Sequence, residues 1–456
     1  MENQFSLRRT LTLFPVVIFG LAYMAPMTVF GTYGVAALTS HGMLPAAYII
    51  ALVAMLFTAF SYGPMVRAYP VAGSAYTYTQ KSISPHVGFL VGWAILMDYL
   101  FLPMINILLN AIYLSAAFPA IPMWVWIVAW VFILTLVNIL GIKVTTSLNV
   151  ILIAFQVLVL VLFVIFSIKG IAGGMGTGTF FSSLPFYNPE VSFSYVLAGA
   201  AILCLSFLGF DSVTMLSEET LDAKKTIPKA VVLTALIGGL LCIFVSYVSH
   251  MVFPDYNSFA NPDSASLEIA ERIGGTLFSS VFLAGLITTG VASGLSSHAS
   301  VSRLLFAMGR DGVLPQKIFG YIHPKYKTPV YNVILIGLFS LSALFLDLVT
   351  AASFINFGAL VAFTFVNLSV IFCYYIKQRR RSAKETVCYL IFPVIGALFN
   401  IWLWTNLDKH AMILGIVWAA CGFVYLLYLT KMFGKRPPEI HFESTESAAD
   451  SKTVAM

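Results

Sequence analysis

Twelve apolar runs, each about as long as a membrane-spanning helix, occupy most of this 456-residue chain. A helix needs about 20 mostly apolar residues to cross the hydrocarbon core of a bilayer. The sequence therefore predicts an all-α integral membrane protein with twelve transmembrane helices. The predicted spans are Leu13–Leu38, Met43–Val66, Val87–Ala117, Met123–Leu140, Ser147–Ile168, Ser192–Met215, Ala230–Phe253, Gly275–Ser300, Pro329–Leu346, Val349–Tyr375, Cys388–Asn406 and Ala411–Met432.

The composition excludes several classes of protein. Hydrophobic residues make up 59% of the chain and charged residues only 10%, whereas a soluble domain carries about 25% charged residues. This leaves too little polar surface for a soluble enzyme. The net charge of +6 does not indicate nucleic-acid binding, because the basic residues follow the membrane topology. We expect a single membrane domain over residues 1–432 and a tail over 433–456.

The basic residues are distributed unequally between the two sides of the predicted spans. If the amino terminus is cytoplasmic, 22 of the 25 Lys and Arg residues lie in segments inside the cell, and only Lys169, Arg272 and Lys409 lie outside. Cytoplasmic loops of membrane proteins carry an excess of Lys and Arg. We therefore predict that both termini are cytoplasmic and that the protein lies in the plasma (inner) membrane.

The first span contains a residue that interrupts helices. Pro26 lacks an amide donor and clashes with the carbonyl of Ala22, so the helix must kink or unwind there. Backbone groups freed at membrane depth are tolerated against protein or a watery cavity. One interpretation is a break that contacts substrate, and the alternative is a kink packed by its neighbours.

The sixth span contains a second interruption. Gly209 weakens the helix, and Asp211 follows it within the apolar run. An ionisable residue inside the membrane is expensive and marks function by default. The alternative is that Asp211 only caps a broken half-helix.

The two interrupted spans occupy matching positions if the chain consists of two five-helix halves. Such a pair of interruptions is typical of a transporter binding site between inverted repeats. The sequence thus predicts one repeat over 13–168, a second over 192–375, and two peripheral helices over 388–432.

A third polar position is Asp98, which lies about 16 Å along the third span at the helical rise. The sequence places no Lys or Arg near the middle of any span. A proton, a metal cation or a positively charged substrate must therefore neutralise Asp98 and Asp211, which are the candidate proton carriers. The expected substrate-binding residues are Tyr23, Ala25, Pro26, Met27, Thr28, Asp98, Tyr99, Phe207, Gly209, Phe210 and Asp211.

No sequence pattern indicates a metal site, a cofactor or catalysis. The five cysteines occur singly, and no CxxC, Cys/His or HExxH spacing is present. Buried small apolar residues are the simplest interpretation of these cysteines. We expect no cofactor, no resident metal and no enzymatic activity.

Several segments resemble the amino acid–polyamine–organocation transporter superfamily over about residues 7–432. They are Tyr69-Pro-Val-Ala-Gly-Ser-Ala-Tyr76, Ser217-Glu-Glu-Thr220, Thr226-Ile-Pro-Lys-Ala230, Ser302-Arg303 and Gly309-Arg-Asp-Gly-Val-Leu-Pro315. Further segments are similar to bacterial putrescine importers. These are Gly20-Leu-Ala-Tyr23, Pro26-Met-Thr-Val-Phe30, Ser84-Pro-His-Val-Gly88, Asp98-Tyr-Leu-Phe-Leu-Pro-Met-Ile-Asn-Ile107 and Ile355-Asn-Phe-Gly-Ala-Leu-Val-Ala-Phe-Thr-Phe-Val-Asn367.

The resemblance implies the leucine-transporter fold and transport at a site between helices 1, 3, 6, 8 and 10. Helices 1, 2, 6 and 7 would form a rocking bundle, helices 3, 4, 8 and 9 a scaffold, and helices 5 and 10 gating arms. It also implies proton-coupled or exchange transport.

Two positions depart from the pattern of this family. Some members carry a Lys in the fifth helix that replaces a coupling cation, and the matching position here is Gln156, which cannot carry charge. Putrescine importers of this pattern often have an acidic residue where this chain has Gly31. The first departure moves a coupling proton to Asp98 or Asp211, and the second weakens the case for a dicationic substrate.

Three functions remain from these patterns. The first is a proton-coupled importer for an amino acid or polyamine, with putrescine-like amines favoured. The second is a permease or exchanger for a zwitterionic amino acid, whose carboxylate would lie at the start of the second half of helix 1. The third is a channel, for which no repeated filter or polar-lined span is present in the sequence.

Overall fold

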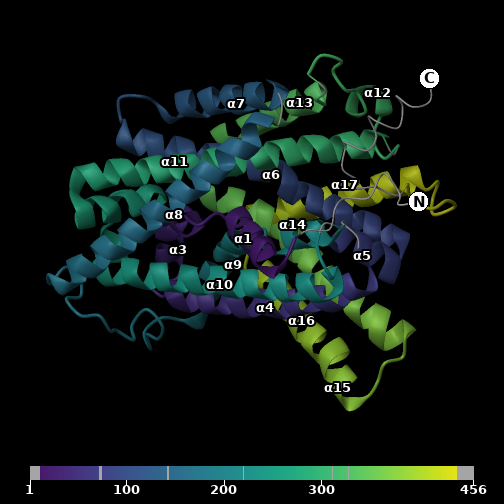
Figure 1. Cartoon of the computed structure of the whole chain (residues 1–456), viewed down its shortest axis with the longest axis horizontal. Coiled ribbons are helices and arrows are strands. Elements are labelled where there is room, and N and C mark those ends of the chain that lie inside the picture. The colour runs from purple at the N-terminus through teal and green to yellow at the C-terminus, as the bar shows by residue number, and fades with distance from the viewer. Residues whose placement is uncertain are drawn as a thin grey trace.

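The computed structural model describes residues 11–70, 74–140, 143–218, 220–310, 312–326 and 328–438. The amino-terminal Arg8 and Arg9 and the tail from residue 439 onward lie outside these ranges, as do parts of the segments 69–76, 217–220 and 309–315. Within the described residues the protein is helical, apart from one isolated bridge between Leu11 and Thr220. Most of the long helices run along the long axis of the molecule (Figure 1).

The long and short helices follow one another in this order. The first half comprises α1 (Leu13–Tyr23), α2 (Thr28–Gly31), α3 (Tyr33–Thr39), α4 (Leu44–Ala68), α5 (Ser74–Ser82), α6 (Pro85–Ala117), α7 (Met123–Leu140) and α8 (Lys143–Ala172). The middle comprises α9 (Phe193–Leu203), η1 (Cys204–Phe207), η2 (Phe210–Glu218), α10 (Ala223–Val252), η3 (Tyr256–Ser258), η4 (Pro262–Ser264), α11 (Ala265–Arg310) and α12 (Gln316–Phe319). The last part comprises α13 (Val330–Ser340), η5 (Leu341–Leu344), α14 (Leu348–Val370), η6 (Ile371–Lys377), α15 (Ala383–Thr386), η7 (Val387–Ile391), α16 (Phe392–Thr405) and α17 (Lys409–Leu429).

Eleven helical stretches of the described residues are long and apolar enough to cross a membrane. They coincide with eleven of the twelve predicted spans, and the all-helical, multi-pass prediction is confirmed. The remaining prediction, Pro329–Leu346, corresponds to a shorter apolar helix over Val330–Leu344. The eighth span is longer than predicted, because α11 continues to Arg310, and its predicted start coincides with a kink at Gly275 (φ 69°).

The long helices pack into two groups. In the α4–α10 group, α10 packs extensively against α4 and also contacts α1, while α9 packs against α4. In the α6–α11 group, α6 packs against α11 and α7, and α13 packs against α7 and α11. Two helices contact both groups: α14 packs against α6 and α4, and α8 packs against α11 and α10.

The last two spans attach to different parts of this arrangement. α17 is held on α6 by a reciprocal pair of hydrogen bonds, in which the indole of Trp93 donates to the carbonyl of Trp418 at 2.9 Å and the indole of Trp418 donates to the carbonyl of Trp93 at 2.8 Å. α16 is held on α4, because Asn400 donates to the hydroxyl of Thr58 at 2.9 Å. Asn367 of α14 donates to the same hydroxyl at 3.1 Å.

Candidate functional site

Helix 1 is interrupted between α1 and α2, as predicted. Residues 24–27 form turns instead of α-helix, and Ala25 has a positive φ of 59°. The amide of Thr28 donates to the carbonyl of Ala25 at 3.0 Å, which restarts the helix beyond Pro26. A non-glycine residue in the left-handed region costs about 1–2 kcal/mol. The break at Pro26 is therefore a strained turn.

Helix 6 is interrupted at the predicted glycine. α9 tightens into η1, and the chain then turns at Gly209, whose φ is 107°. The hydroxyl and amide of Ser212 both donate to the carbonyl of Gly209, at 2.6 and 3.0 Å. On the other side of the break, Asn356 of α14 donates to the carbonyls of Ala201 and Ile202, at 2.8 and 3.2 Å. Side chains thus satisfy backbone groups that a continuous helix would pair internally.

The two breaks contact each other. A Cβ atom built on Gly209 would lie 2.3 Å from Cδ1 of Tyr23, the last residue of α1. Glycine is therefore required at position 209 both for its φ and for the space that the Tyr23 ring occupies. This contact brings the end of α1 against the middle of helix 6.

Asp98 and Asp211 approach the same region from α6 and η2. Their carboxyl groups lie within electrostatic range of each other, and the hydroxyls of Tyr23 and Tyr99 lie within the same range. The hydroxyl of Tyr62 on α4 donates to Oδ2 of Asp211 at 3.2 Å. All four side chains, Tyr23, Asp98, Tyr99 and Asp211, remain partly accessible, although they belong to predicted spans. The structure therefore places two acidic groups and two phenols near one another beside the two breaks.

The other predicted site residues divide into two sets. Ala25, Pro26 and Thr28 are partly accessible at the helix 1 break. Met27, Phe207 and Phe210 are buried. Met27 lies against Gly285 of α11, Phe207 lies against α4 and α10, and the ring of Phe210 packs against Tyr62 and Phe363. These three buried side chains therefore pack the two breaks against α4, α10, α11 and α14.

The sequence analysis did not single out three residues that support this region. Tyr62 binds Asp211, Asn356 caps the carbonyls at the helix 6 break, and Gly358 lets α14 cross α6 closely. A Cβ atom on Gly358 would lie 2.5 Å from the carbonyl oxygen of Ala94, one turn before Asp98. A polar residue in an apolar run was the available signal for Asn356, because such residues in spans face the protein interior.

The two positions that depart from the family pattern are also defined. Gln156 of α8 is 1% exposed, and its Oε1 has no hydrogen-bond partner within the described part of the chain. Gly31 is partly accessible, and a Cβ atom there would meet Leu109 at an ordinary contact distance of 3.5 Å. Packing therefore does not exclude a side chain at position 31.

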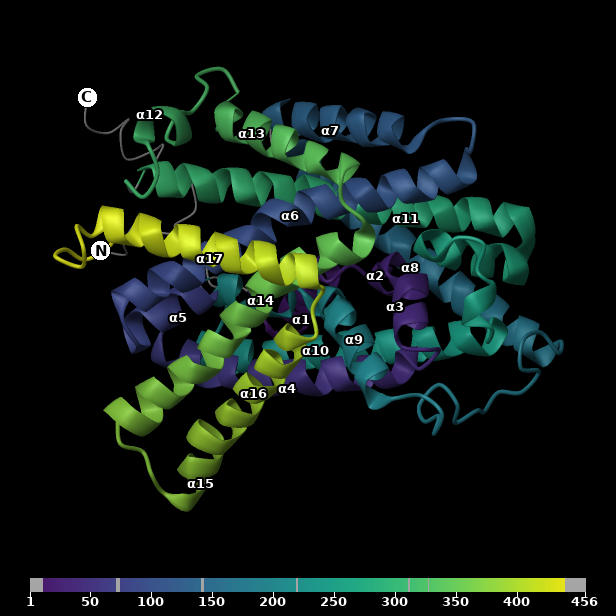
Figure 2. The ribbon, with the colours of Figure 1, turned by 180° about the vertical axis from the view of Figure 1, so that it is seen from behind.

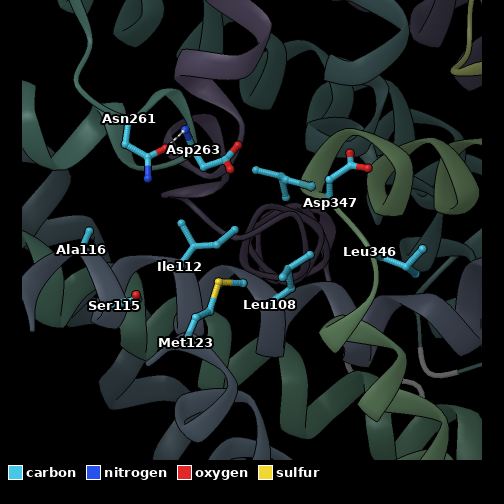
Figure 3. Close-up of a pocket in the computed structure, with 10 residues that line it drawn as sticks. Leu108, Ile112, Ser115, Ala116, Met123, Asn261, Asp263, Leu346 and Asp347 are labelled. Atoms are coloured by element: carbon cyan, nitrogen blue, oxygen red, sulfur yellow. Dashed lines mark hydrogen bonds between the residues drawn. The ribbon is translucent and has the colours of Figure 1, made fainter. Parts of the chain in front are cut away.

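A cavity of about 190 Å³ lies at the end of the bundle where α6 ends and α14 begins. Figure 3 shows Asp263 and Asp347 along one side of it, and Leu108, Ile112 and Met123 along the opposite side. Asp347 is the N-cap of α14 and accepts hydrogen bonds from the amide and hydroxyl of Thr350, at 2.9 and 2.7 Å. The cavity thus combines carboxylates with an apolar wall.

The carboxyl of Asp347 is ionised at neutral pH. Its partial burial raises the pKa, but the hydrogen bonds from Thr350 outweigh this effect and hold the pKa of Asp347 below its ordinary value. The stability that this cap contributes is therefore present above the unfolded-state pKa and is lost only as the pH falls through the folded-state pKa.

Comparison with known proteins identifies the class of this chain. Residues 16–436 match the amino acid permease family. The low-affinity putrescine importer PlaP of Escherichia coli (strain K12) is 48% identical over 96% of this chain and 97% of its own length. The branched-chain amino acid permease BcaP and the methylthioribose transporter, both of Bacillus subtilis (strain 168), are 28% and 27% identical, each over 93% of this chain and 94% of its own length.

The family match covers nearly all of the described helices, including both breaks and both deep carboxylates. The resemblance to putrescine importers is confirmed by the identity over almost the whole chain. The protein is a multi-pass membrane transporter rather than an enzyme, and it belongs to the amino acid permease family.

Proposed function

We propose that this protein imports a putrescine-like amine across the bacterial inner membrane by alternating access. The observation that carries the proposal is the 48% identity, over 96% of the chain, to a protein named as a putrescine importer. The geometry supports it because Asp98 and Asp211 lie within electrostatic range of each other beside the two helix breaks. A diamine offers two ammonium groups, and hydrogen bonds between ammonium and carboxylate groups are among the strongest in proteins.

We place the site among Tyr23, Asp98, Tyr99, Asp211 and the broken backbone near Pro26 and Gly209. The carbonyl ends of the half-helices attract cations, and the amide ends attract anions. The cavity lined by Asp263 and Asp347 also favours a positively charged substrate, because carboxylates that line a cleft raise the local concentration of cations. Its apolar wall suits the methylene chain of an alkylamine.

We propose the arrangement of two inverted repeats, 13–168 and 192–375, with peripheral helices over 388–432. The breaks at corresponding places in the two halves support it, as does the packing of the long helices into two groups. In this arrangement the α4–α10 group moves against the α6–α11 group, and α8 and α14, which contact both groups, act as the arms. The Val330–Leu344 helix then serves as the ninth span. Both termini lie in the cytoplasm, as the distribution of 22 of the 25 basic residues indicates.

We propose that a proton gradient drives the import. Gln156 cannot ionise, so the proton carrier is assigned to Asp98 or Asp211. Collapsing the gradient with an ionophore in proteoliposomes should abolish accumulation of labelled putrescine. Accumulation that persists without a gradient, or that requires sodium, would exclude proton coupling without affecting the assignment of the substrate.

The test of the substrate is uptake of labelled putrescine by the reconstituted protein, with unlabelled diamines and neutral amino acids as competitors. Asp211→Asn should weaken putrescine binding by about tenfold or more, because a charge-assisted hydrogen bond contributes about 1.5–3 kcal/mol. Asp255→Asn, which alters a carboxylate in the loop before η3, is the matched control and should leave binding unchanged. A protein that neither transports putrescine nor is inhibited by it would contradict the diamine proposal.

A permease for a zwitterionic amino acid is the second candidate, and Gly31 is the observation that favours it. Position 31 holds no acidic residue although its packing leaves room for a Cβ atom. The substrate carboxylate would then lie at the amides near Met27 and Thr28, and Asp98→Asn would prevent gradient-driven accumulation but preserve exchange. Conversely, Gly31→Glu should increase the preference for diamines over neutral amino acids in the competition assay if this position faces the second amine.

A further inference from the structure

The segment between α14 and α16 projects from the bundle. Residues 371–391, which we call the basic hairpin, contain the wide helical turns η6 and η7 and the short helix α15. Figures 1 and 2 show α15 standing apart from the packed helices, with α16 leading back to them. This projecting position leaves the tip of the hairpin available to the surroundings of the protein.

The tip of the hairpin carries a dense positive charge. Five basic residues lie within 377–385, and all five are exposed: Lys377, Arg379, Arg380, Arg381 and Lys384. The single acid in this stretch, Glu385, accepts hydrogen bonds from the amide and hydroxyl of Ser382, at 3.2 and 2.7 Å. Within the described part of the chain, none of the three arginines forms an ion pair with an acidic side chain. The hairpin therefore lacks an internal counter-charge that matches its basic residues.

Aromatic rings lie directly beneath two of the guanidinium groups. Arg380 lies over the ring of Tyr374 at 5.4 Å, and Arg381 lies over the ring of Tyr375 at 5.2 Å. Tyr374 in turn stacks on Tyr389 from the returning arm at 4.5 Å. Tyrosines of membrane proteins concentrate at the level of the lipid headgroups, where one side of the ring is apolar and the other is wet.

The arms of the hairpin carry exposed apolar residues on both sides of the tyrosines. Ile376 on one arm is 46% exposed, and Val387, Ile391 and Phe392 on the other are exposed to a similar extent. A hairpin whose arms carry apolar residues and tyrosines and whose tip is basic matches the change from acyl chains to headgroups in a leaflet. This arrangement indicates that the hairpin contacts the surface of the membrane.

We propose that the basic hairpin binds the phosphate groups of anionic phospholipid headgroups in the leaflet next to its tip. Arginine suits this role because its planar guanidinium can donate two parallel hydrogen bonds to one phosphate. A cluster of basic residues immediately beyond a membrane span is the pattern that attracts anionic lipid. The proposal does not depend on the substrate, and its test does not measure transport.

Lipid binding at this tip acts on the ends of three helices. The hydroxyl of Tyr374 donates to the carbonyl of Pro64 in α4 at 2.9 Å. The ammonium of Lys377 donates to the carbonyl of Lys81 in α5 at 3.4 Å. A bound headgroup that holds the hairpin therefore steadies α4, α5 and α14 at the same end of the bundle.

The test measures lipid binding to the full-length purified protein. Spin-labelled phosphatidylglycerol and spin-labelled phosphatidylcholine are compared as probes, and the signal is the ratio of motionally restricted lipid of the two kinds. We expect the wild type to prefer phosphatidylglycerol. The triple variant Arg379→Gln, Arg380→Gln, Arg381→Gln should lower this preference by about fivefold or more, because each basic residue near an anionic surface contributes about a fivefold attraction.

Two further variants test whether a loss of lipid preference comes from the arginines at the tip, from total positive charge or from misfolding. Lys317→Gln, Lys325→Gln and Lys435→Gln together remove three exposed charges elsewhere and should lower the preference much less than the triple arginine variant does. Replacing the three arginines by lysine should retain most of it. The proposal would be overturned if the triple glutamine variant kept its preference for phosphatidylglycerol. It would also be overturned if the three-lysine control lost as much of the preference, or if the arginine-to-lysine variant lost all of it. Displacement of the labelled lipid by inorganic phosphate would assign the site to a soluble anion and would also overturn it.

Discussion

The breaks in helix 1 and helix 6 are built from different chemistry, although they contact each other. Helix 1 turns at Ala25, a residue with a side chain, followed by Pro26. Helix 6 turns at Gly209, where a Cβ atom would overlap the ring of Tyr23. The first break is thus imposed by a missing amide donor, and the second by a close approach that only glycine permits. Substitutions at the two breaks should therefore fail for different reasons.

The partners of the two breaks differ as well. The carbonyl of Phe30, just beyond the helix 1 break, accepts from the hydroxyl of Tyr113 at 2.8 Å and also from the amide of Thr32. At helix 6, the side chain of Asn356 donates to two successive carbonyls. The Ile202 carbonyl also accepts from the amide of Cys204, but at helix 6 a single side chain from α14 serves two carbonyls, whereas Tyr113 serves one. The helix 6 break should be the more sensitive to the loss of its partner.

The largest effect is expected for Gly209→Ala. The added methyl group would lie 2.3 Å from the ring of Tyr23. The alanine would also have to keep a φ of 107°, which a residue with a side chain rarely adopts. We expect uptake to fall by about 100-fold, corresponding to about 2.7 kcal/mol, while the protein still inserts. Gly312→Ala is the matched control, since Gly312 also has a positive φ but no atom within 4 Å of its Cβ position. Equal losses in both variants would show that backbone strain, and not contact between the breaks, is responsible.

Pro26→Leu should have the next largest effect. Leucine restores the amide donor and favours a continuous helix across residues 24–27. We expect uptake to fall by about tenfold or more, measured at equal amounts of inserted protein. Pro15→Leu, in the first turn of α1 where proline is tolerated, should transport normally. Normal uptake by the Pro26 variant would mean that the helix 1 break is only a packed kink.

Asn356→Leu sharpens the comparison between the partners. It removes the side-chain donor to the carbonyls of Ala201 and Ile202, and a buried group left unpaired costs about 1–3 kcal/mol. We expect a lower melting temperature and several-fold slower uptake. Asn138→Leu is the control, because Asn138 of α7 is also buried but donates to its own helix, at the carbonyl of Leu134. A larger defect in the control would contradict a special role for Asn356.

The smallest effects are expected for two other substitutions near the helix 1 break. Tyr113→Phe removes one of two donors to the Phe30 carbonyl and should cost about 1 kcal/mol, with less than about threefold change in uptake. Ala25→Gly relieves the left-handed strain and should leave uptake near the wild-type rate. If Tyr113→Phe slows uptake more than Asn356→Leu does, the ranking of the two breaks is reversed.

The sequence was sufficient to predict both breaks. Pro26 and Gly209 act on their own backbone, so their effect is local and readable from the residue type. The depth of Asp98, counted along one apolar run, stays a prediction. The eleven longest spans were predicted for the same reason, because length and hydropathy are properties of a continuous segment.

Other features depend on pairs of residues far apart in the chain. The contact between Tyr23 and Gly209, and the hydrogen bonds from Asn356 to helix 6, require the relative rotation of helices, which hydropathy does not encode. The end of α11 was placed too early, at Ser300, because the basic residues Arg303 and Arg310 lower the hydropathy without ending the helix. The substrate-facing side chains remain predictions, since they depend on such rotations.

The tryptophan pair between α6 and α17 makes the last two helices a place where relative movement of the two helix groups can be measured. Trp93 and Trp418 exchange two hydrogen bonds, so α17 is fastened to α6, whereas Asn400 fastens α16 to α4. α16 and α17 are neighbours in the chain, joined by residues 406–408, yet they are anchored to different groups of helices. Any sliding of α4 past α6 would therefore act across that short joint and across α14, on which both helices pack. Fluorescent labels on the ends of α16 and α17 that lie away from this joint would report relative movement of the two helix groups, and they would not alter the helices that we propose surround the substrate.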